Sequence, residues 1–177
     1  LAAKETSSLD FEKMYDYKNK IIKQIVRGRE INKSLNEFSH TVDYDVQAVN
    51  IDDAISKFLI LIDRIAKNNE TVLKFERSDT AVELNLNLFN FYHLFFLTLF
   101  FIIENSSINS EIMIRTQNDC IKFESQIDES KDLQKNLNEL EETNSDLFKI
   151  LKIRNNGKNL LVQLIIGDIK WARRKSF

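Results

Sequence analysis

The sequence predicts an α+β fold, a two-layer sandwich of helices on a single sheet, preceded by one long helix. Three observations support this prediction. An apolar stripe with helical periodicity runs over residues 9–42, strand-like segments occur in pairs, and the stretch from Leu88 to Ser107 is apolar on nearly every side. The 177 residues suffice for one large or two small domains. We expect a helical segment over 1–45 and an α+β domain over 49–177.

Residues 9–42 are expected to form one helix of more than 30 residues, with its apolar side chains at steps of three and four. Those side chains are Met14, Ile21, Ile25, Ile31, Leu35, Phe38 and Val42, with Gly28 on the same stripe. A solitary helix of this length needs a partner for its apolar stripe. An earlier helix of the same protein, a second copy of the chain, or both could supply it. Residues 43–50 are expected to be a linker.

The next helix is predicted to begin with Asp52 or Asp53 as its N-cap and to run to about Lys67. Two strands, Thr71–Glu76 and Ala81–Asn87, are expected to follow it. The second of them alternates apolar and polar residues, which is typical of a strand with one buried face.

The segment Phe89–Ile103 carries only three polar side chains, those of Asn90, His93 and Thr98. A bilayer span needs about 20 apolar residues, so we predict a core helix covered on every side and no membrane span in this chain. His93 is then expected to be a neutral core residue with one hydrogen bond, and not a catalytic group. Asn105 lies at the polar end of this helix, where it could cap backbone carbonyl groups.

The C-terminal part is predicted to contain two further strands, a polar insert, a helix and a final pair of strands. Residues 127–143 are charged and should form a loop or a loosely held helix, with three leucines as its anchors. The expected segments are strands at Glu111–Thr116 and Cys120–Ser125, a helix from about Ser145 to Arg154 with Gly157 as its C-cap, and strands at Asn159–Ile166 and Asp168–Arg174. The basic C-terminal end is expected to be a solvated strand face.

Composition excludes several classes of function. The formal net charge is −2, so a nucleic-acid partner is not expected. The single cysteine, Cys120, excludes a disulfide within the chain and fits a reducing, cytoplasmic setting, and two histidines give no zinc-ligand spacing. Three glycines and no proline leave no glycine-rich loop for phosphate, because such a loop needs several glycines for close approach of the backbone.

The order of elements after residue 50 resembles the ATP-binding domain of sensor histidine kinases and of its relatives among gyrases, Hsp90-type chaperones and MutL-type proteins. In that family a helix carries the N box, roughly N-L-x-x-N-A. The residues Phe101–Ser106, FIIENS, stand in the corresponding place. The resemblance implies ATP and Mg²⁺ as cofactors, with Asn105 helping to hold Mg²⁺ against the phosphates and Glu104 as a further nucleotide-binding candidate.

The resemblance extends to the long helix. Residues 21–43 resemble the second helix of the dimerisation and phosphotransfer hairpin, which commonly ends in L-x-x-F-[SA]-[RH], and Leu35–His40 fits that pattern as LNEFSH. This implies a homodimer through the helix at 9–42 and a response regulator as partner. His40 is a candidate phosphoacceptor because it lies on a helix near the carboxylate of Glu37. The alternative, which we favour, is that His40 is a helix-end residue linking the two domains.

The chain also departs from the family pattern. Phe101 stands where the N box has its first polar residue, and the G1 and G2 boxes, at Gln126–Ser130 and Thr143–Asp146, contain no glycine. Asp128 is the nearest match to the aspartate that binds the adenine amino group, one residue out of register. Bulky residues in place of these glycines block the approach of backbone N–H groups to phosphate.

We therefore expect a histidine-kinase-like two-component module with a degenerate ATP-binding site. One alternative is a non-catalytic dimeric scaffold that docks a response regulator. Another is a pure interaction protein in which the long helix binds a partner and the α+β domain adds stability. An unrelated α+β enzyme is disfavoured, because the sequence offers no nucleophile–base or carboxylate pair for it.

Overall fold

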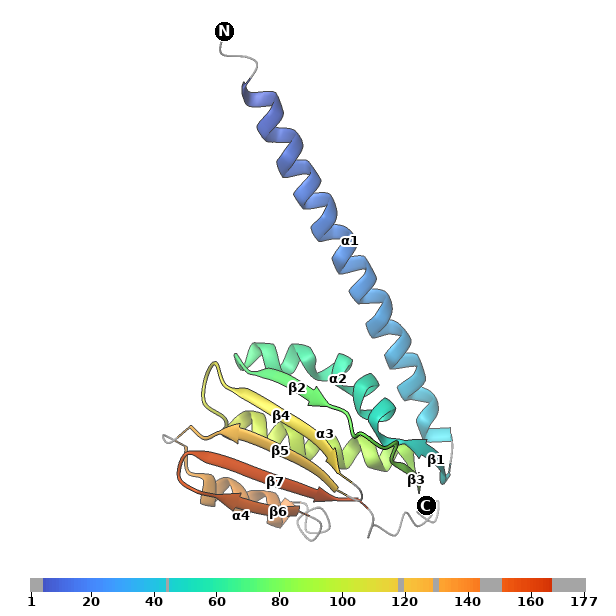
Figure 1. Ribbon diagram of the computed structural model, residues 1–177, viewed down its shortest axis with the longest axis vertical. Coiled ribbons are helices and arrows are strands. Elements are labelled where there is room, and N and C mark those ends of the chain that lie inside the picture. The colour runs from blue at the N-terminus through green and yellow to red at the C-terminus, as the bar shows by residue number, and fades with distance from the viewer. Residues whose placement is uncertain (1–4, 44, 118–119, 129–130, 144–150, 167–177) are drawn as a thin grey trace.

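The computed structural model describes residues 5–43, 45–117, 120–128, 131–143 and 151–166. It confirms the predicted class, since a long helix, α1 (Glu5–His40), projects from an α+β domain in which helices cover one face of a sheet (Figure 1). A single 3₁₀ turn, Thr41–Asp43, follows α1 and leads into the domain. The boundaries of 1–45 and 49–177 that the sequence predicts for the two parts stay a prediction.

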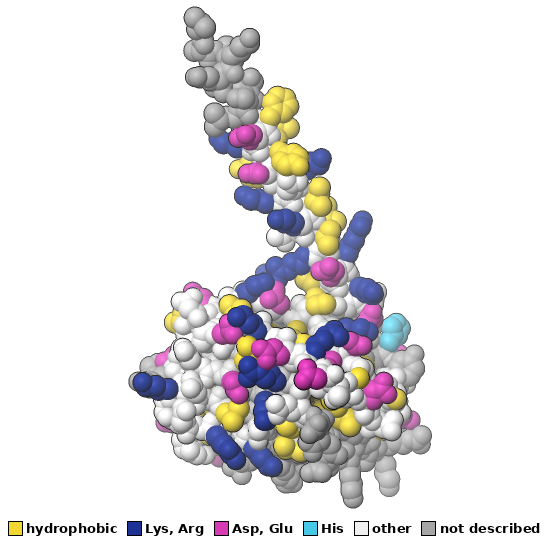
Figure 2. All heavy atoms as spheres, in the orientation of Figure 1, with side chains coloured by type: hydrophobic (Ala, Val, Ile, Leu, Met, Phe, Trp, Pro, Cys, Tyr) yellow, Lys and Arg dark blue, Asp and Glu magenta, His cyan; other side chains and the backbone are white. Residues whose placement is uncertain are grey.

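Only the C-terminal part of α1 is attached to the domain. Arg27 Nη2 lies 2.8 Å from Asp63 Oδ2, and Glu37 Oε2 lies 2.9 Å from Lys57 Nζ. Toward its N-terminal end the apolar stripe of α1 is exposed to solvent, as Figure 2 shows along the projecting helix. Eight of its side chains are between 46% and 72% exposed: Phe11, Met14, Tyr15, Tyr17, Ile21, Ile22, Ile25 and Val26. The described residues of the domain leave this part of the stripe exposed.

The strands form two sheets where the sequence predicted one. The larger sheet has the order β2-β4-β5-β7-β6, with β2 parallel to β4 and its other pairs antiparallel. These strands are β2 (Val72–Glu76), β4 (Glu111–Gln117), β5 (Cys120–Gln126), β7 (Asn159–Ile165) and β6 (Leu151–Asn155). A separate antiparallel pair joins β1 (Gln47–Asn50) to β3 (Glu83–Leu86). The expected linker at 43–50 thus contains a strand, because pairing with a distant segment stabilises it.

Three further helices pack on the sheet: α2 (Ile51–Asn68), α3 (Leu88–Asn105) and α4 (Leu133–Thr143). The N-cap of α2 is Asn50, whose side chain accepts a hydrogen bond from the backbone N–H of Asp53, so the prediction of Asp52 or Asp53 as cap is wrong. Asp52 is buried and accepts hydrogen bonds from the backbone N–H of Ser78 and from the hydroxyl of Thr116. Its carboxylate still lies in the first helical turn, where negative charge is favourable.

The core lies between the sheet and helices α2 and α3. Along α3 the side chains of Phe91, Phe95, Leu99 and Ile102 are fully buried. By length and composition α3 could cross a membrane, but half of its residues are buried inside this domain, so its packing is that of a core helix. It is not covered on every side, however. His93 is exposed and Phe89 is 36% exposed, so the prediction of His93 as a core residue is wrong.

The prediction of a helix from about Ser145 to Arg154 is wrong for its second half. Leu151–Asn155 is the strand β6, in which Leu151 and Ile153 pack against the core and the intervening side chains are exposed. Gly157 is in the turn between β6 and β7, with φ +89°, and does not cap a helix. Residues 145–150, the predicted strand at 168–174 and the basic C-terminal end lie outside the described residues.

Candidate functional site

The C-terminal end of α3 is closed by polar side chains of the chain itself. Asn105 is 1% exposed, and its Nδ2 donates a 2.8 Å hydrogen bond to the carbonyl of Phe101. The Ser106 hydroxyl bonds the carbonyl of Ile102 and the hydroxyl of Ser125, both at 2.6 Å. The last carbonyls of a helix lack partners within the helix. Asn105 and Ser106 supply them, which is the capping role that the sequence left open for Asn105.

Asn136, on α4, completes the hydrogen bonding of Asn105. Its Nδ2 donates to Asn105 Oδ1 at 2.7 Å, so both polar atoms of the buried amide have a partner within the protein. Three leucines hold α4 in this place by packing against the core: Leu133, Leu137 and Leu140. The segment 127–143, left open by the sequence as a loop or a helix, is therefore a short link followed by a docked helix.

A lysine occupies the space just beyond the end of α3. Lys131 Nζ donates to the carbonyl of Glu104, approaches the carbonyl of Ser106 at 3.5 Å and lies 3.7 Å from the Asp128 carboxylate. The backbone N–H of Asp128 donates to the carbonyl of Asn105 at 3.0 Å. A cation at a helix C-terminus is electrostatically favourable, because the helix dipole places negative charge there.

The structure thus brings together three of the predicted site residues, Asn105, Glu104 and Asp128. Sequence reasoning missed Asn136 and Lys131. Both lie in a polar segment, and no local pattern marks either of them as a partner of the distant helix end.

A small cavity opens where the end of α3 meets α4. Its volume is about 240 Å³, below the 300–1,000 Å³ that is typical of ligand pockets. Glu104 and Glu139 both line it, and their negative charge opposes the approach of a triphosphate. Phe101, only 6% exposed, fills the position of the first polar residue of the N box. Residues 127–132 link β5 to α4.

The candidate phosphoacceptor lies elsewhere. The His40 side chain is 73% exposed at the end of α1, with its Nδ1 3.5 Å from the Asp43 carboxylate. It shares a second cavity with Tyr92, near the start of α3. Tyr92 precedes Asn105 by 13 residues, which is roughly 20 Å along a helix. His40 is therefore not part of the site at the end of α3.

The described residues contain no group of three or more His, Cys, Asp or Glu side chains that could hold a metal ion. Mg²⁺ prefers oxygen ligands in near-octahedral geometry. At the end of α3 the oxygen of Asn105 already accepts a hydrogen bond and the nearest cation is Lys131. The residues present do not fit a bound Mg–nucleotide complex.

No protein-family model matches the sequence, and no curated protein matches it. Solved structures do match. The cytoplasmic segment of the histidine kinase QseC has a TM-score of 0.51 and 8% identity over 78% of this chain and 93% of that chain. The Acinetobacter baumannii histidine kinase AdeS has a TM-score of 0.47 and 12% identity over 85% of this chain and 84% of that chain.

The histidine kinase ThkA, in complex with the response regulator TrrA, matches with a TM-score of 0.45 and 17% identity over 94% of this chain and 53% of that chain. At such identities a likeness shows the fold alone. The match to QseC shows that this chain has a histidine-kinase-like fold, a helix followed by an ATP-binding-type domain, as the resemblance implied.

Proposed function

We propose that this chain, which has the fold of a histidine-kinase cytoplasmic segment, is a two-component signalling module with a degenerate ATP-binding site. The observation that carries the proposal is the hydrogen bond from Asn136 Nδ2 to Asn105 Oδ1. Asn105 matches the N-box residue that helps hold Mg²⁺ in the kinases, and here its oxygen serves the packing of α4. Freeing it would leave a buried polar atom without a partner, which costs about 1–3 kcal/mol.

Three other features support the same proposal. The segments that match the G1 and G2 boxes have no glycine, so backbone N–H groups cannot approach phosphate closely. The segment 127–143, which would be the ATP lid in an active relative, contains the helix α4, and three leucines hold this helix against the core. Finally, Lys131 places a covalently attached cation at the helix end, so the helix dipole is balanced without a metal ion.

In this proposal the module acts as a scaffold. Its exposed apolar stripe on α1 pairs with a second copy, and the dimer docks a response regulator in a cytoplasmic setting. His40 is then a residue at the junction of α1 and the domain, in a different cavity from the one that Asn105 lines. A rival to this proposal is that the protein retains a kinase reaction. That reaction would require MgATP to displace Asn136 from Asn105.

Titration calorimetry with MgATP tests the degenerate site. We expect no saturable heat at millimolar nucleotide for the parent chain. We expect none for Asn136→Ala either, because the glycines would still be missing. The control is Asn138→Ala, an exposed asparagine on the same helix. Saturable binding to the parent chain would overturn the proposal in favour of an active kinase.

A second arm separates the scaffold from a pure interaction protein. The dimeric chain is mixed with a panel of purified receiver domains, with and without beryllofluoride as a phosphoryl analogue, and binding is followed by interferometry. Selective binding of a receiver domain supports the scaffold, whereas binding of none of them favours an interaction protein outside two-component signalling.

A further inference from the structure

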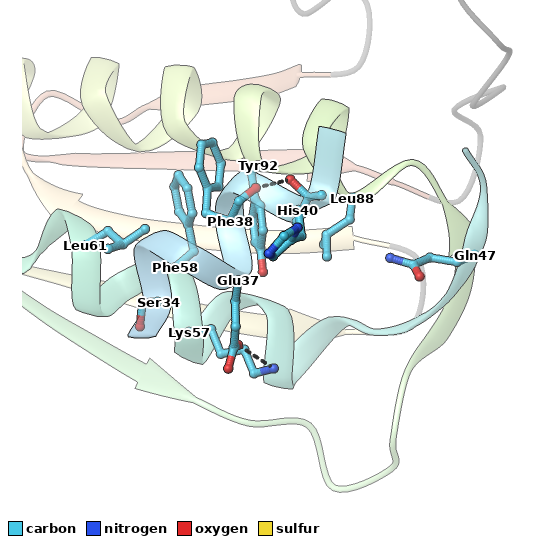
Figure 3. Close-up of a pocket in the computed structure, with 11 residues that line it drawn as sticks. Ser34, Glu37, Phe38, His40, Gln47, Lys57, Phe58, Leu61, Leu88 and Tyr92 are labelled. Carbon is cyan, nitrogen blue, oxygen red and sulfur yellow. Dashed lines mark hydrogen bonds and ion pairs between the residues drawn. The ribbon is translucent and has the colours of Figure 1, made fainter. Parts of the chain in front are cut away.

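A second cavity, which we call the hinge pocket, lies where the end of α1 meets α2 and α3 (Figure 3). It has a volume of about 310 Å³, within the range of small-molecule sites in proteins. The six lining residues that matter for its chemistry are Glu37, Phe38, His40, Lys57, Phe58 and Tyr92. The long helix and the α+β domain therefore both contribute to its walls.

Aromatic rings form the apolar wall of the hinge pocket. The rings of Phe58 and Tyr92 are stacked, with centroids 4.6 Å apart and an interplanar angle of 11°. Phe38, from α1, lies against both, at 6.1 Å from Phe58 and 5.7 Å from Tyr92. Because each ring is held by the other two, this wall exists before any ligand binds.

The hydroxyl group of Tyr92 is the distinctive polar feature of the hinge pocket. Tyr92 is only 5% exposed, and no hydrogen bond joins its hydroxyl to a described residue. The hydroxyl is not a fully buried atom, because among the described residues only Ser110 Oγ is buried without a partner, so it opens into the cavity. Figure 3 shows this hydroxyl beside His40 and Glu37, directed into the space that they line. A buried tyrosine usually finds a partner for its O–H. A donor that opens into a cavity is free to donate to the acceptor of a ligand in place of water.

Charges of both signs surround the mouth of the hinge pocket. Glu37 is paired with Lys57 at 2.9 Å and with Lys33 at 3.9 Å, and His40 lies 3.5 Å from Asp43. The two lysines and the two carboxylates carry equal and opposite charge. This balanced arrangement offers no net electrostatic attraction to a strongly charged ligand such as a nucleotide. It does not disfavour the binding of an uncharged ligand.

We propose that the hinge pocket binds a small uncharged aromatic molecule whose acceptor oxygen takes a hydrogen bond from the Tyr92 hydroxyl. The aromatic wall contacts the ring of the ligand, and the Tyr92 O–H sets its orientation. Because Phe38 belongs to α1 while Phe58 and Tyr92 belong to the domain, the bound ligand touches both parts. It would strengthen the attachment of α1 to the domain. This site is separate from the former nucleotide site and does not depend on the function proposed for it.

Two probes of nearly equal size test the proposal. Benzyl alcohol carries the acceptor oxygen, and ethylbenzene has a methyl group in its place. Each is titrated into the ¹⁵N-labelled chain, and chemical-shift changes of the amides around Phe58 and Tyr92 give the affinity. We expect benzyl alcohol to bind about five-fold more tightly, which corresponds to one hydrogen bond of about 1 kcal/mol. In Tyr92→Phe, which keeps the ring, we expect this preference to disappear.

Charged analogues complete the test. Benzoate and benzylammonium should bind more weakly than benzyl alcohol, because they bring an uncompensated charge into the pocket. The proposal is overturned if neither neutral probe shifts the pocket amides at millimolar concentration. It is overturned equally if Tyr92→Phe keeps the preference for benzyl alcohol, or if a charged analogue binds best.

Discussion

Asn105 is a buried polar residue with a structural role in this chain. The sequence places it at the polar end of the most apolar helix, and the structure buries it there with both amide atoms hydrogen-bonded. An amide satisfied on both sides contributes to stability and is costly to disrupt. Asn105 thus caps the end of α3 and joins it to α4.

The first prediction concerns the partner of Asn105. Asn136→Ala leaves the buried oxygen of Asn105 without a donor, so we expect the free energy of unfolding to fall by about 1–3 kcal/mol. Urea denaturation followed by circular dichroism measures it. Asn138→Ala is the matched control and should cost less than about 0.5 kcal/mol, because Asn138 is exposed and bonds only Gln134. Equal losses in the two variants would contradict the role given to Asn136.

The second prediction concerns pH. Burial, and next the negative charge of Glu37, raise the pKa of Tyr92 from its ordinary value near 10 to about 12. A pKa raised in the folded state means that Tyr92 contributes stability that is fully present below pH 10. This contribution is lost as the pH rises through about 12.

Urea midpoints of the parent chain and of Tyr92→Phe, measured from pH 9 to the onset of alkaline unfolding, test this sign. The parent should lose stability more steeply above pH 10, because phenylalanine has no proton to lose. A steeper loss in Tyr92→Phe than in the parent would show that the sign is wrong.

At the scale of elements, α1 has two parts with different surroundings. From Arg27 onward α1 packs against the domain. It is held there by the ion pairs Arg27–Asp63 and Glu37–Lys57 and by the contact of the Phe38 ring with Phe58. Before that point its apolar side chains are exposed. An exposed apolar patch of this extent marks an interaction surface.

The third prediction tests the exposed part of α1. Ile25→Glu places a charge on the apolar stripe, so we expect dimers to dissociate at least ten-fold more readily in sedimentation equilibrium; burying an unpaired charge costs more than about 1.4 kcal/mol. Lys13→Glu, an exposed polar residue of the same helix, is the control and should leave the association unchanged within two-fold. Association that is unaffected by either substitution would show that the proposed dimer does not form through the apolar stripe.

The fourth prediction tests the fastened part of α1. Phe38→Ala removes a ring that touches Phe58, Phe89 and Tyr92, so we expect a loss of about 2–4 kcal/mol and faster hydrogen exchange over residues 27–41. Phe11→Ala is the same substitution at a side chain that is 72% exposed. It should leave exchange over 27–41 unchanged. Similar exchange in both variants would mean that Phe38 does not hold α1 to the domain.

Some of the helices and strands could be predicted from the sequence. The long helix, α2, α3 and most strands follow from periodicity, because each has a clear apolar face. The segment Leu151–Asn155 fits both a helical and a strand period in so short a window. The Asn156-Gly157 turn that follows is a hairpin signal that decides for the strand.

Other features could not be predicted, for physical reasons. A helix that is apolar all round has no pattern to show which face stays open, so the exposure of His93 was not visible in the sequence. The bond between Asn105 and Asn136 joins residues 31 positions apart and depends on how α4 packs. The free hydroxyl of Tyr92 likewise arises from tertiary packing.

For the molecule as a whole, the architecture and the chemistry of the candidate site have to be considered separately. The core, the sheet order and the long helix agree with a histidine-kinase-like architecture. At the end of α3 the polar groups take part in packing, with Lys131 on the carbonyl of Glu104 and Asn136 on the side chain of Asn105. A fold therefore does not determine a function, which depends on the groups at the site.

In the proposed closed state, Asn136 stays hydrogen-bonded to Asn105 at the end of α3. The side-chain amide signals of these two residues report on this state directly. These signals are recorded in ¹H–¹⁵N spectra while MgATP is added to millimolar concentration. We predict that neither signal shifts and that the Asn105 amide protons stay protected from exchange with water. Saturable shifts of both signals, with loss of that protection, would show that nucleotide opens the site and would contradict the account.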